Sequence, residues 1–337
     1  MRGNLYKIHL LSKNVPIELF HGNNILVTGG AGFIGSWICD ALIRLGSSVT
    51  CIDNLSTGRM RNIQHLRAFR NFSFINADVN AYNITRRYDM IIHCASIPSP
   101  DDYMRRPLES MLPNSVGLLN LLEAARRDDS IILFMSSSEV YGSANVIPTP
   151  EDYWGYVNPI GPRSCYDESK RFGEALCMAY YRQYGVDVRI ARIFNTYGPR
   201  MDLEARYARV IPRFIIQALR GEPITIHGDG LQTRSFCYIT DTVMALLKML
   251  IVDKCRGEVV NIGSPHETTI LELAKTIKRL TGSNSPLKFV EPRPDDPRRR
   301  CPDITKARRL LGWEPKVPLE EGLKCTIEWF KTELGYR

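Results

Sequence analysis

The chain has 337 residues, of which 44% are hydrophobic and 24% are charged, as in an ordinary globular enzyme. This length favours one unit with two lobes over two independent domains. The formal net charge is +8, but the basic residues are dispersed and the sharpest run, Arg298-Arg299-Arg300, is short. Nucleic-acid binding is therefore disfavoured, and an anionic small substrate explains the positive charge equally well.

The cysteines and the apolar segments indicate the compartment. There are nine cysteines, with no Cys-x-x-Cys pair and no Cys/His spacing typical of zinc sites. We therefore expect reduced cysteines, no metal and a cytoplasmic location. No apolar stretch is long enough to cross a membrane, and residues 1–22 lack the continuous apolar core of a signal peptide. Residues 1–22 are interpreted as an N-terminal arm.

The first strong pattern is a strand, a glycine-rich turn, a helix and a second strand. Residues 24–28 form a short apolar run, the glycine-rich turn spans 29–35, and an amphipathic helix ends at Gly46. The second strand, 48–52, is followed by Asp53-Asn54. This order predicts a dinucleotide site, in which the glycines admit a pyrophosphate and the helix N-terminus supplies N–H donors. Since a carboxylate at Asp53 accepts from ribose hydroxyls and repels a 2′-phosphate, NAD is favoured over NADP.

The alternation of strands and helices continues. Apolar strands are predicted at 72–76, 90–96 and 131–135, with a helix near 108–127. Short apolar strands alternating with helices predict an α/β fold with a Rossmann-type, doubly wound parallel sheet. Ligands bind beyond the carboxyl ends of the strands in such sheets. We therefore expect Ser96, Ser137, Ser138 and Glu139 to point into one crevice.

A Tyr-x-x-x-Lys pair follows at Tyr166 and Lys170. Side chains four positions apart share one face of a helix, so we expect Lys170 to lie beside Tyr166. A free tyrosine has a pKa of ~10, and a neighbouring cation favours the phenolate. The pair therefore predicts a general base that removes a hydroxyl proton while a hydride leaves the same carbon. Alone the pair is weak; its value comes from the nucleotide fold that precedes it.

After Arg192 the pattern becomes less regular and richer in helices. Helices are predicted near 210–220, 240–252, 269–281, 304–311 and 319–333. We interpret residues 23–193 as an NAD-binding Rossmann domain and residues 194–337 as mainly a smaller, substrate-binding C-terminal lobe. The segments 143–163 and 291–302 concentrate proline, glycine and charge, which indicates functional loops near the site.

Four further segments resemble a known family. The chain at 151–168, 193–201, 230–236 and 295–304 closely resembles the UDP-glucuronate decarboxylases (UDP-xylose synthases) of the extended short-chain dehydrogenase/reductase superfamily. The resemblance runs from about Asn24 to the C-terminus. The first and last segments are specific to these decarboxylases, whereas the glycine turn and Tyr-x-x-x-Lys are common to the superfamily.

The resemblance implies a role for individual residues. NAD would be bound by Gly29, Gly32, Phe33, Ile34, Asp53, Asn54, Thr57, Gly58, Asp78, Val79, Ser96, Tyr166 and Lys170. Catalysis would fall to Tyr166, Lys170, Ser137, Ser138, Glu139 and Arg300. The UDP-sugar substrate would contact Tyr103, Asn195, Arg209, Arg234 and Arg300. A homodimer is also expected from the family.

The family chemistry implied by the resemblance has three stages. Tyr166 would take the C4 hydroxyl proton while C4 hydride passes to NAD. The resulting ketone is β to the sugar carboxylate, so CO₂ can leave, with Glu139 and Ser138 serving this step. C5 is then protonated and the hydride returns to C4, giving UDP-xylose.

Several alternatives remain open at this point. The enzyme could release the 4-keto pentose or rearrange it to a branched sugar. A 4-epimerase or a 4,6-dehydratase is disfavoured by Ser138-Glu139, because related dehydratases carry Asp-Glu there and epimerases generally lack the acid. A non-catalytic protein that senses NAD or a nucleotide sugar would have no need to keep Tyr166, Lys170 and Glu139. Leu112-Pro113 replaces the Lys-Thr of some family members, which alters the expected sugar and cofactor contacts.

Overall fold

A computed structural model describes residues 16–203, 209–292 and 296–336. The predicted N-terminal arm therefore lies outside the described residues up to position 15. Its remainder contains a short 3₁₀ turn, η1 (Ile17–Leu19), before the first strand. No helix in the described part of the chain is both long enough and apolar enough to cross a membrane.

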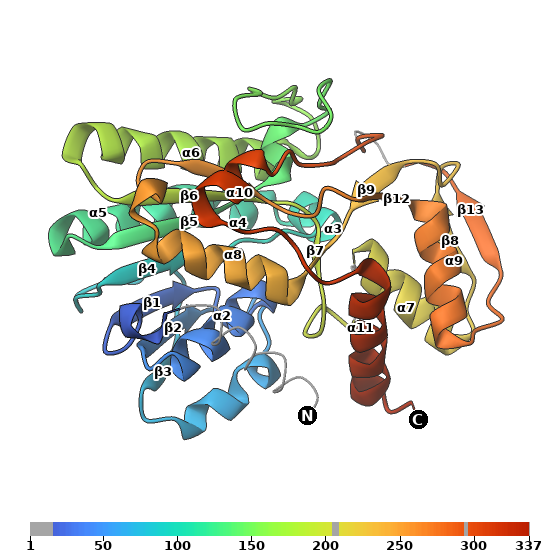
Figure 1. Ribbon diagram of the computed structural model, residues 1–337, viewed down its shortest axis with the longest axis horizontal. Helices are drawn as coiled ribbons and strands as arrows, with labels where there is room; N and C mark the ends of the chain where they lie inside the picture. The colour runs from blue at the N-terminus through green and yellow to red at the C-terminus, as the bar shows by residue number, and fades with distance from the viewer. Residues whose placement is uncertain (1–15, 204–208, 293–295, 337) are drawn as a thin grey trace.

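A seven-stranded parallel sheet forms the centre of the molecule (Figure 1). Its strands are β1 (Asn24–Thr28), β2 (Ser48–Asp53), β3 (Phe72–Asn76), β4 (Met90–His93), β5 (Ile131–Ser137), β6 (Val188–Ile193) and β11 (Val259–Ile262). The spatial order is β11-β6-β5-β4-β1-β2-β3, so the direction of winding reverses between β1 and β4. This is the doubly wound Rossmann arrangement, and the predicted fold class is confirmed.

Helices cover both faces of the sheet because its strands are apolar on both sides. On one face, α2 (Phe33–Arg44) and α8 (Ile239–Ile251) share a core cluster with Ile25 and Val27 of β1. On the other face, α5 (Leu118–Asp128) and α6 (Ser164–Tyr184) pack with Leu26. Successive residues of β1 thus point into two different cores, as pleating requires.

The helix predicted near 108–127 is divided. The structure has α3 (Pro100–Arg105), α4 (Pro107–Leu112), a π-helical segment at Pro113–Gly117 and then α5. Proline has no N–H for the regular helical hydrogen bond, which accounts for the irregular turn at Pro113. The apolar run predicted as a strand at 90–96 stays extended only to His93.

A smaller group of elements lies beside the sheet (Figure 1). It contains α7 (Val210–Arg220), α9 (Ile270–Thr281), α11 (Leu319–Leu334) and the strand pairs β8 (Ile224–His227) with β13 (Leu287–Val290) and β9 (Thr233–Ser235) with β12 (Glu267–Thr269). The predicted helices at 210–220, 269–281 and 319–333 are confirmed to within one residue at each end.

The chain crosses between the two regions more than once. Strand β11 joins the edge of the large sheet, and α8 and α10 (Thr305–Leu311) pack near it, although all three follow residue 194. The division at residue 194 stays a prediction. A further pair, β7 (Thr196–Tyr197) with β10 (Cys237–Tyr238), lies at the junction. The remaining short 3₁₀ turns are η2 (Met60–Asn62), η3 (Gln64–Ala68), η5 (Ser138–Tyr141) and η6 (Asp253–Cys255).

Candidate active site

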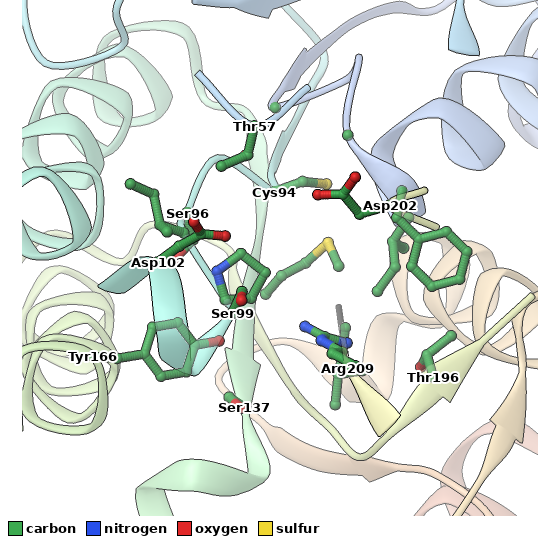
Figure 2. A pocket seen from close by; sticks show the side chains of 18 of the residues that line it. Thr57, Cys94, Ser96, Ser99, Asp102, Ser137, Tyr166, Thr196, Asp202 and Arg209 are labelled. Carbon is green, nitrogen blue, oxygen red and sulfur yellow. The ribbon is translucent and has the colours of Figure 1, made fainter. Parts of the chain in front are cut away.

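One large cleft of about 550 Å³ opens where the sheet's strands end at their carboxyl termini. Its walls come from the turns after β1, β2, β4 and β5 on one side and from residues 193–202, 209–213, 227–236 and 296–300 on the other. Figure 2 shows Tyr166 and Arg209 pointing into this cleft from opposite sides, with Ser96 and Thr57 farther along it. The predicted crevice is therefore present, and Ser96, Ser137, Ser138 and Glu139 all line it.

The glycine turn at one end of the cleft is tightly packed. Gly29 has a φ of +69°, and a Cβ there would lie 2.6 Å from the backbone nitrogen of Ala95. A Cβ on Gly35 would lie 2.3 Å from the carbonyl oxygen of Gly29. Gly32 begins α2 without any side-chain cap, so the first N–H groups of that helix are left for a ligand. The turn thus has both the space and the donors that a pyrophosphate needs.

Asp53 ends β2 and organises the next part of the cleft. Its two carboxylate oxygens accept the N–H groups of Ala31 at 2.9 Å and Leu55 at 2.8 Å. Burial raises the pKa of this carboxyl, and the two backbone N–H groups oppose that rise. Each oxygen keeps a lone pair, so the side chain both braces the glycine turn and can accept from a ribose diol.

The neighbouring residues of the predicted dinucleotide set lie where expected, with one exception. Asn54 donates to Asp78 at 3.1 Å, and the hydroxyl of Ser96 accepts from the Asn114 amide at 3.1 Å. The cleft is lined by Gly29, Gly32, Phe33, Ile34, Asp53, Asn54, Thr57, Asp78, Val79, Ser96, Tyr166 and Lys170. Gly58 is not in the wall; a Cβ there would lie 2.7 Å from an Asp53 carboxylate oxygen, so its smallness serves Asp53.

Tyr166 and Lys170 both lie on α6, and Lys170 lies beside the phenol ring as its spacing predicts, but it is not among the main groups that lower the pKa of Tyr166. The Lys170 ammonium donates to the Met135 carbonyl at 2.7 Å and lies 5.8 Å from the centre of the Tyr166 ring. Burial lowers the pKa of Lys170 to about 7 and raises the pKa of Tyr166 to about 12. A hydrogen bond with Ser137 and the charge of Arg209 oppose the rise at Tyr166. Arg209 is thus a cation that favours the phenolate.

Tyr103 does not line the cleft, contrary to the expected substrate contact. It is buried behind Tyr166, and the two rings stack with their centres 5.1 Å apart and their planes 5° apart. Its hydroxyl is buried without a hydrogen-bond partner among the described residues. The ring of Tyr103 therefore supports the position of the Tyr166 ring.

Glu139 lies between two arginines, at the start of the turn that follows β5. Arg163 donates to its Oε2 at 2.6 Å, and Arg300 donates to its Oε1. Burial alone would raise the pKa of Glu139, but Arg300 and Arg163 outweigh burial and lower it to about 2. Glu139 is therefore an anion at neutral pH. Its pairing with Arg300 joins the large sheet to the loop after β13.

The remaining predicted substrate residues form the opposite wall. Arg234 is only 7% exposed, donates to the Thr233 carbonyl at 2.8 Å and pairs with Asp296 at 2.8 Å. Arg209 begins α7, and Asn195 follows β6. Asn195, Arg209, Arg234 and Arg300 thus face the same cleft from the second half of the chain. Three guanidinium groups and an amide in one wall suit an anionic substrate.

Some residues of the site were not foreseen as functional. Arg163 and Asp296 lie within the resembling segments but carried no role of their own. Asn114, in the π-helical segment, donates to the hydroxyls of both Ser96 and Ser169. Arg163 could have been identified from its position three residues before Tyr166, at the predicted start of the helix that carries the base. The pairing partner of Asp296 could not be read from the sequence, because it lies on a distant strand.

The comparisons with known proteins agree with this geometry. The family model described as GDP-mannose 4,6 dehydratase matches residues 26–326. UDP-glucuronic acid decarboxylase 1 of Danio rerio is 50% identical over 313 residues, which cover 93% of this chain and 74% of that protein. UDP-glucuronic acid decarboxylase 5 of Arabidopsis thaliana is 47% identical over 312 residues, which cover 92% of this chain and 90% of that protein.

A solved structure extends the comparison to the fold. The UDP-glucuronic acid 4-epimerase of Bacillus cereus, in complex with UDP-glucuronic acid and NAD, is 32% identical with a TM-score of 0.84. That match covers 92% of this chain and 99% of the epimerase chain. Given the extent and identity of the matches to the two decarboxylases, this chain belongs to the UDP-glucuronic acid decarboxylase family, within the group that the GDP-mannose 4,6 dehydratase model describes.

Proposed function

We propose that this protein is an NAD-dependent decarboxylase that converts UDP-glucuronate to UDP-xylose and CO₂ through a 4-keto intermediate. The observation that carries the proposal is the meeting of Tyr166, Glu139 and Arg300 in one cleft, in a chain about half identical to named decarboxylases. These residues supply a base for the C4 hydroxyl, a fixed anion and a guanidinium for the sugar carboxylate.

The residues at the sheet's end of the cleft fit NAD. Gly29 and Gly35 leave no room for a Cβ, α2 begins without a side-chain cap, and Asp53 stands at the end of β2. The glycine turn would hold the pyrophosphate, and Asp53 would hold the ribose diol. When bound, NAD would supply the hydride acceptor and donor for C4. The carboxylate at Asp53 opposes a 2′-phosphate, which is why NADP is disfavoured.

Tyr166 would take the proton of the C4 hydroxyl. Its own hydroxyl is hydrogen-bonded with Ser137, and its ring is fixed by stacking on Tyr103. Because burial holds its pKa high in the structure described here, a nearby positive charge is needed to form the phenolate at neutral pH. Arg209 supplies part of that charge. Lys170, which donates to the Met135 carbonyl, would lie between the bound cofactor and Tyr166.

Glu139, Ser138 and Arg300 would act at the sugar acid. Arg300 has one terminal nitrogen on Glu139 and another that is buried without a partner among the described residues. That second nitrogen would be available for the substrate carboxylate, and a guanidinium recognises such a group well. Glu139, as an anion, and Ser138 would orient the ring, and the Ser138 hydroxyl would relay the proton that reaches C5 after CO₂ leaves.

A 4-epimerase is the second candidate, because solved structures similar to this chain include UDP-sugar 4-epimerases. Such an enzyme needs the same Tyr166 and the same dinucleotide turn. It needs no group to manage the loss of a carboxylate, whereas this chain fixes Glu139 between two arginines. The curated relatives with higher identity also bear the decarboxylase name. Decarboxylation is therefore favoured.

A homodimer is part of the proposal. Exposed apolar side chains lie at intervals of three or four residues on α4, the π-helical segment and α5: Leu108, Met111, Leu112, Val116 and Leu119. Helix α6, which packs against α4, adds Phe172 at 52% exposure. Two copies could bury these stripes as a four-helix interface. Leu108→Asp should then give monomers in light scattering, while an unchanged dimer mass would argue against this interface.

A cytoplasmic location is proposed from the cysteines. None of the nine forms a disulfide bond, and seven of them are buried. Reduced thiols in this number suit a reducing compartment.

The function is tested by incubating the purified protein with UDP-glucuronate and identifying the products. Release of CO₂ with UDP-xylose supports the proposal. A product that keeps its carboxylate and has inverted C4 would identify an epimerase, and a 4-keto pentose would identify an enzyme that stops halfway.

A further inference from the structure

We propose that Arg163 is a positioning residue that holds Glu139 in place while Arg300 also engages the substrate carboxylate, an inference that rests on the proposed decarboxylase function. The two arginines contact different oxygens of Glu139, so Arg163 can hold one oxygen while Arg300 divides its contacts between the other oxygen and the substrate. Arg163 is thus the partner that serves Glu139 rather than the substrate.

The two arginines are attached to different parts of the molecule. Arg163 caps the start of α6, and its carbonyl oxygen accepts the N–H groups of Tyr166 and Asp167, each at 3.1 Å. Its side chain donates to Glu139, while its backbone carbonyl accepts from Tyr166, the proposed base. Arg300 instead lies on the loop after β13. Its carbonyl oxygen accepts the N–H of Ser235 of β9, in the smaller region. Arg163 therefore fixes the distance between Glu139 and Tyr166.

The guanidinium of Arg163 is surrounded by the protein's own carboxylates, so its nitrogens are not available to a substrate. Its three side-chain nitrogens face three carboxylates: Glu139 at 2.6 Å, Asp296 at 3.8 Å and Asp167 at 4.0 Å. The residue is only 9% exposed. Arg300, by contrast, has a terminal nitrogen without a partner among the described residues. The substrate carboxylate should therefore go to Arg300, and Arg163 should stay with the protein's own anions.

The consequence for Glu139 is that it stays ionised and oriented through the decarboxylation step. Charged and titratable groups from several elements interact with its charge: Tyr103 on α3, Arg163 just before α6, Tyr166 and Asp167 on α6, Arg234 on β9, and Arg300. Among these, only Arg163 and Arg300 are hydrogen-bonded to it. When Arg300 shares its charge between Glu139 and the substrate, Arg163 is the hydrogen-bonded cation that stays with the protein's own carboxylates.

The test compares Arg163→Met and Arg163→Lys with the wild-type holoenzyme, using UDP-glucuronate and CO₂ release across pH. Arg163→Met should lower kcat by about 10²-fold while KM changes less than about threefold. The acid limb of its kcat profile should move to higher pH, because Glu139 then protonates more easily. Arg163→Lys keeps a cation, so it should restore the acid limb toward the wild-type position although kcat stays reduced.

Two controls separate this role from simple support of the fold. Arg171→Met removes a neighbouring arginine of α6 that donates to the carbonyl oxygens of Val140 at 3.0 Å and Trp154 at 2.6 Å but does not touch Glu139. Its pH profile should match the wild type. Asp167 has a pKa raised to about 7 by burial and by Glu139, so the shift of the acid limb should persist in an Asp167→Asn background.

The outcomes are distinct. Unchanged kcat and pH profile in Arg163→Met, or a raised KM at unchanged kcat, would overturn the inference, the latter by making Arg163 a substrate-binding residue. If Arg163→Met does not fold, Arg163→Lys decides: a wild-type kcat in it would also overturn the inference. A wild-type enzyme that releases no CO₂ would instead remove the proposed function itself.

Discussion

Arg300 donates to the carboxylate of Glu139 across 161 positions of sequence, and this contact joins the Rossmann sheet to the loop that follows β13. The pairing places a guanidinium and a carboxylate in the same cleft as Tyr166, where the charge of Glu139 raises the pKa of the phenol. It gives the site an element that hydride transfer alone does not need.

Tyr166→Phe should abolish the first oxidation. The variant keeps the ring and its stacking on Tyr103 but loses the hydroxyl, and loss of a general base costs ~10²–10⁴-fold. No NADH absorbance should appear after UDP-glucuronate is added, even transiently. Tyr184→Phe, on an exposed position of the same helix, is the matched control and should behave as the wild type. A Tyr166→Phe enzyme that still forms NADH would show that another group is the base.

Asp53→Ala should weaken NAD binding and leave NADP binding poor or slightly improved. Loss of hydrogen bonds to a charged group is worth roughly 1.5–3 kcal/mol, and this carboxylate also braces Ala31 and Leu55. Calorimetric titration of both dinucleotides into the wild type and the variant measures the effect. Equal affinity of the wild type for NAD and NADP would contradict the role given to Asp53.

Glu139→Gln should still bind UDP-glucuronate but release CO₂ ~10²–10⁴-fold more slowly. The amide keeps the shape of the side chain and loses the charge that Arg163 and Arg300 hold. Glu168→Gln, on the outer part of α6, is the control. Near-normal CO₂ release by Glu139→Gln would remove this residue from the mechanism.

Lys170 makes stability depend on pH in a predictable direction. Burial lowers its pKa to about 7, below the ~10.4 of an unfolded lysine. Between these values the unfolded chain binds more protons at this site than the folded chain, so this site makes the free energy of unfolding rise with pH. Below about pH 7 the buried charge is a cost to the folded state.

The measurement is the difference in unfolding free energy between the wild type and Lys170→Met, followed from pH 6 to pH 10 by denaturant titration. This difference should shift in favour of the wild type as pH rises, since other titrating groups are common to both proteins. A difference that is constant with pH would show that Lys170 is not desolvated as the structure has it.

The parts of this structure that the sequence predicted are local patterns. The turn at Gly29–Gly35, the strands of the sheet and the Tyr166–Lys170 helix each depend on residues close together in the chain. The helices after residue 209 were also predicted from the spacing of their apolar residues. A family resemblance supplied Arg209, Arg234 and Arg300, which no local pattern connects with the sheet.

What the sequence could not give depends on burial and on distant contacts. The expectation that Lys170 lowers the pKa of Tyr166 used spacing alone. Burial, which spacing does not reveal, raises the pKa of Tyr166 and lowers the pKa of Lys170. Tyr103 was expected at the substrate and is instead stacked behind Tyr166. The division of the 108–127 helix follows from Pro113, which was visible, but the π-helical form of the turn was not.

The most direct test of the account is the reaction of UDP-glucuronate in heavy water with a catalytic amount of NAD. The account predicts UDP-xylose and CO₂, one solvent deuterium at C5, the substrate's own hydrogen at C4 and no stoichiometric NADH. Proton NMR and mass spectrometry of the product read all of these together. A 4-keto product with one NADH per CO₂, or a UDP-sugar that retains its carboxylate, would contradict it.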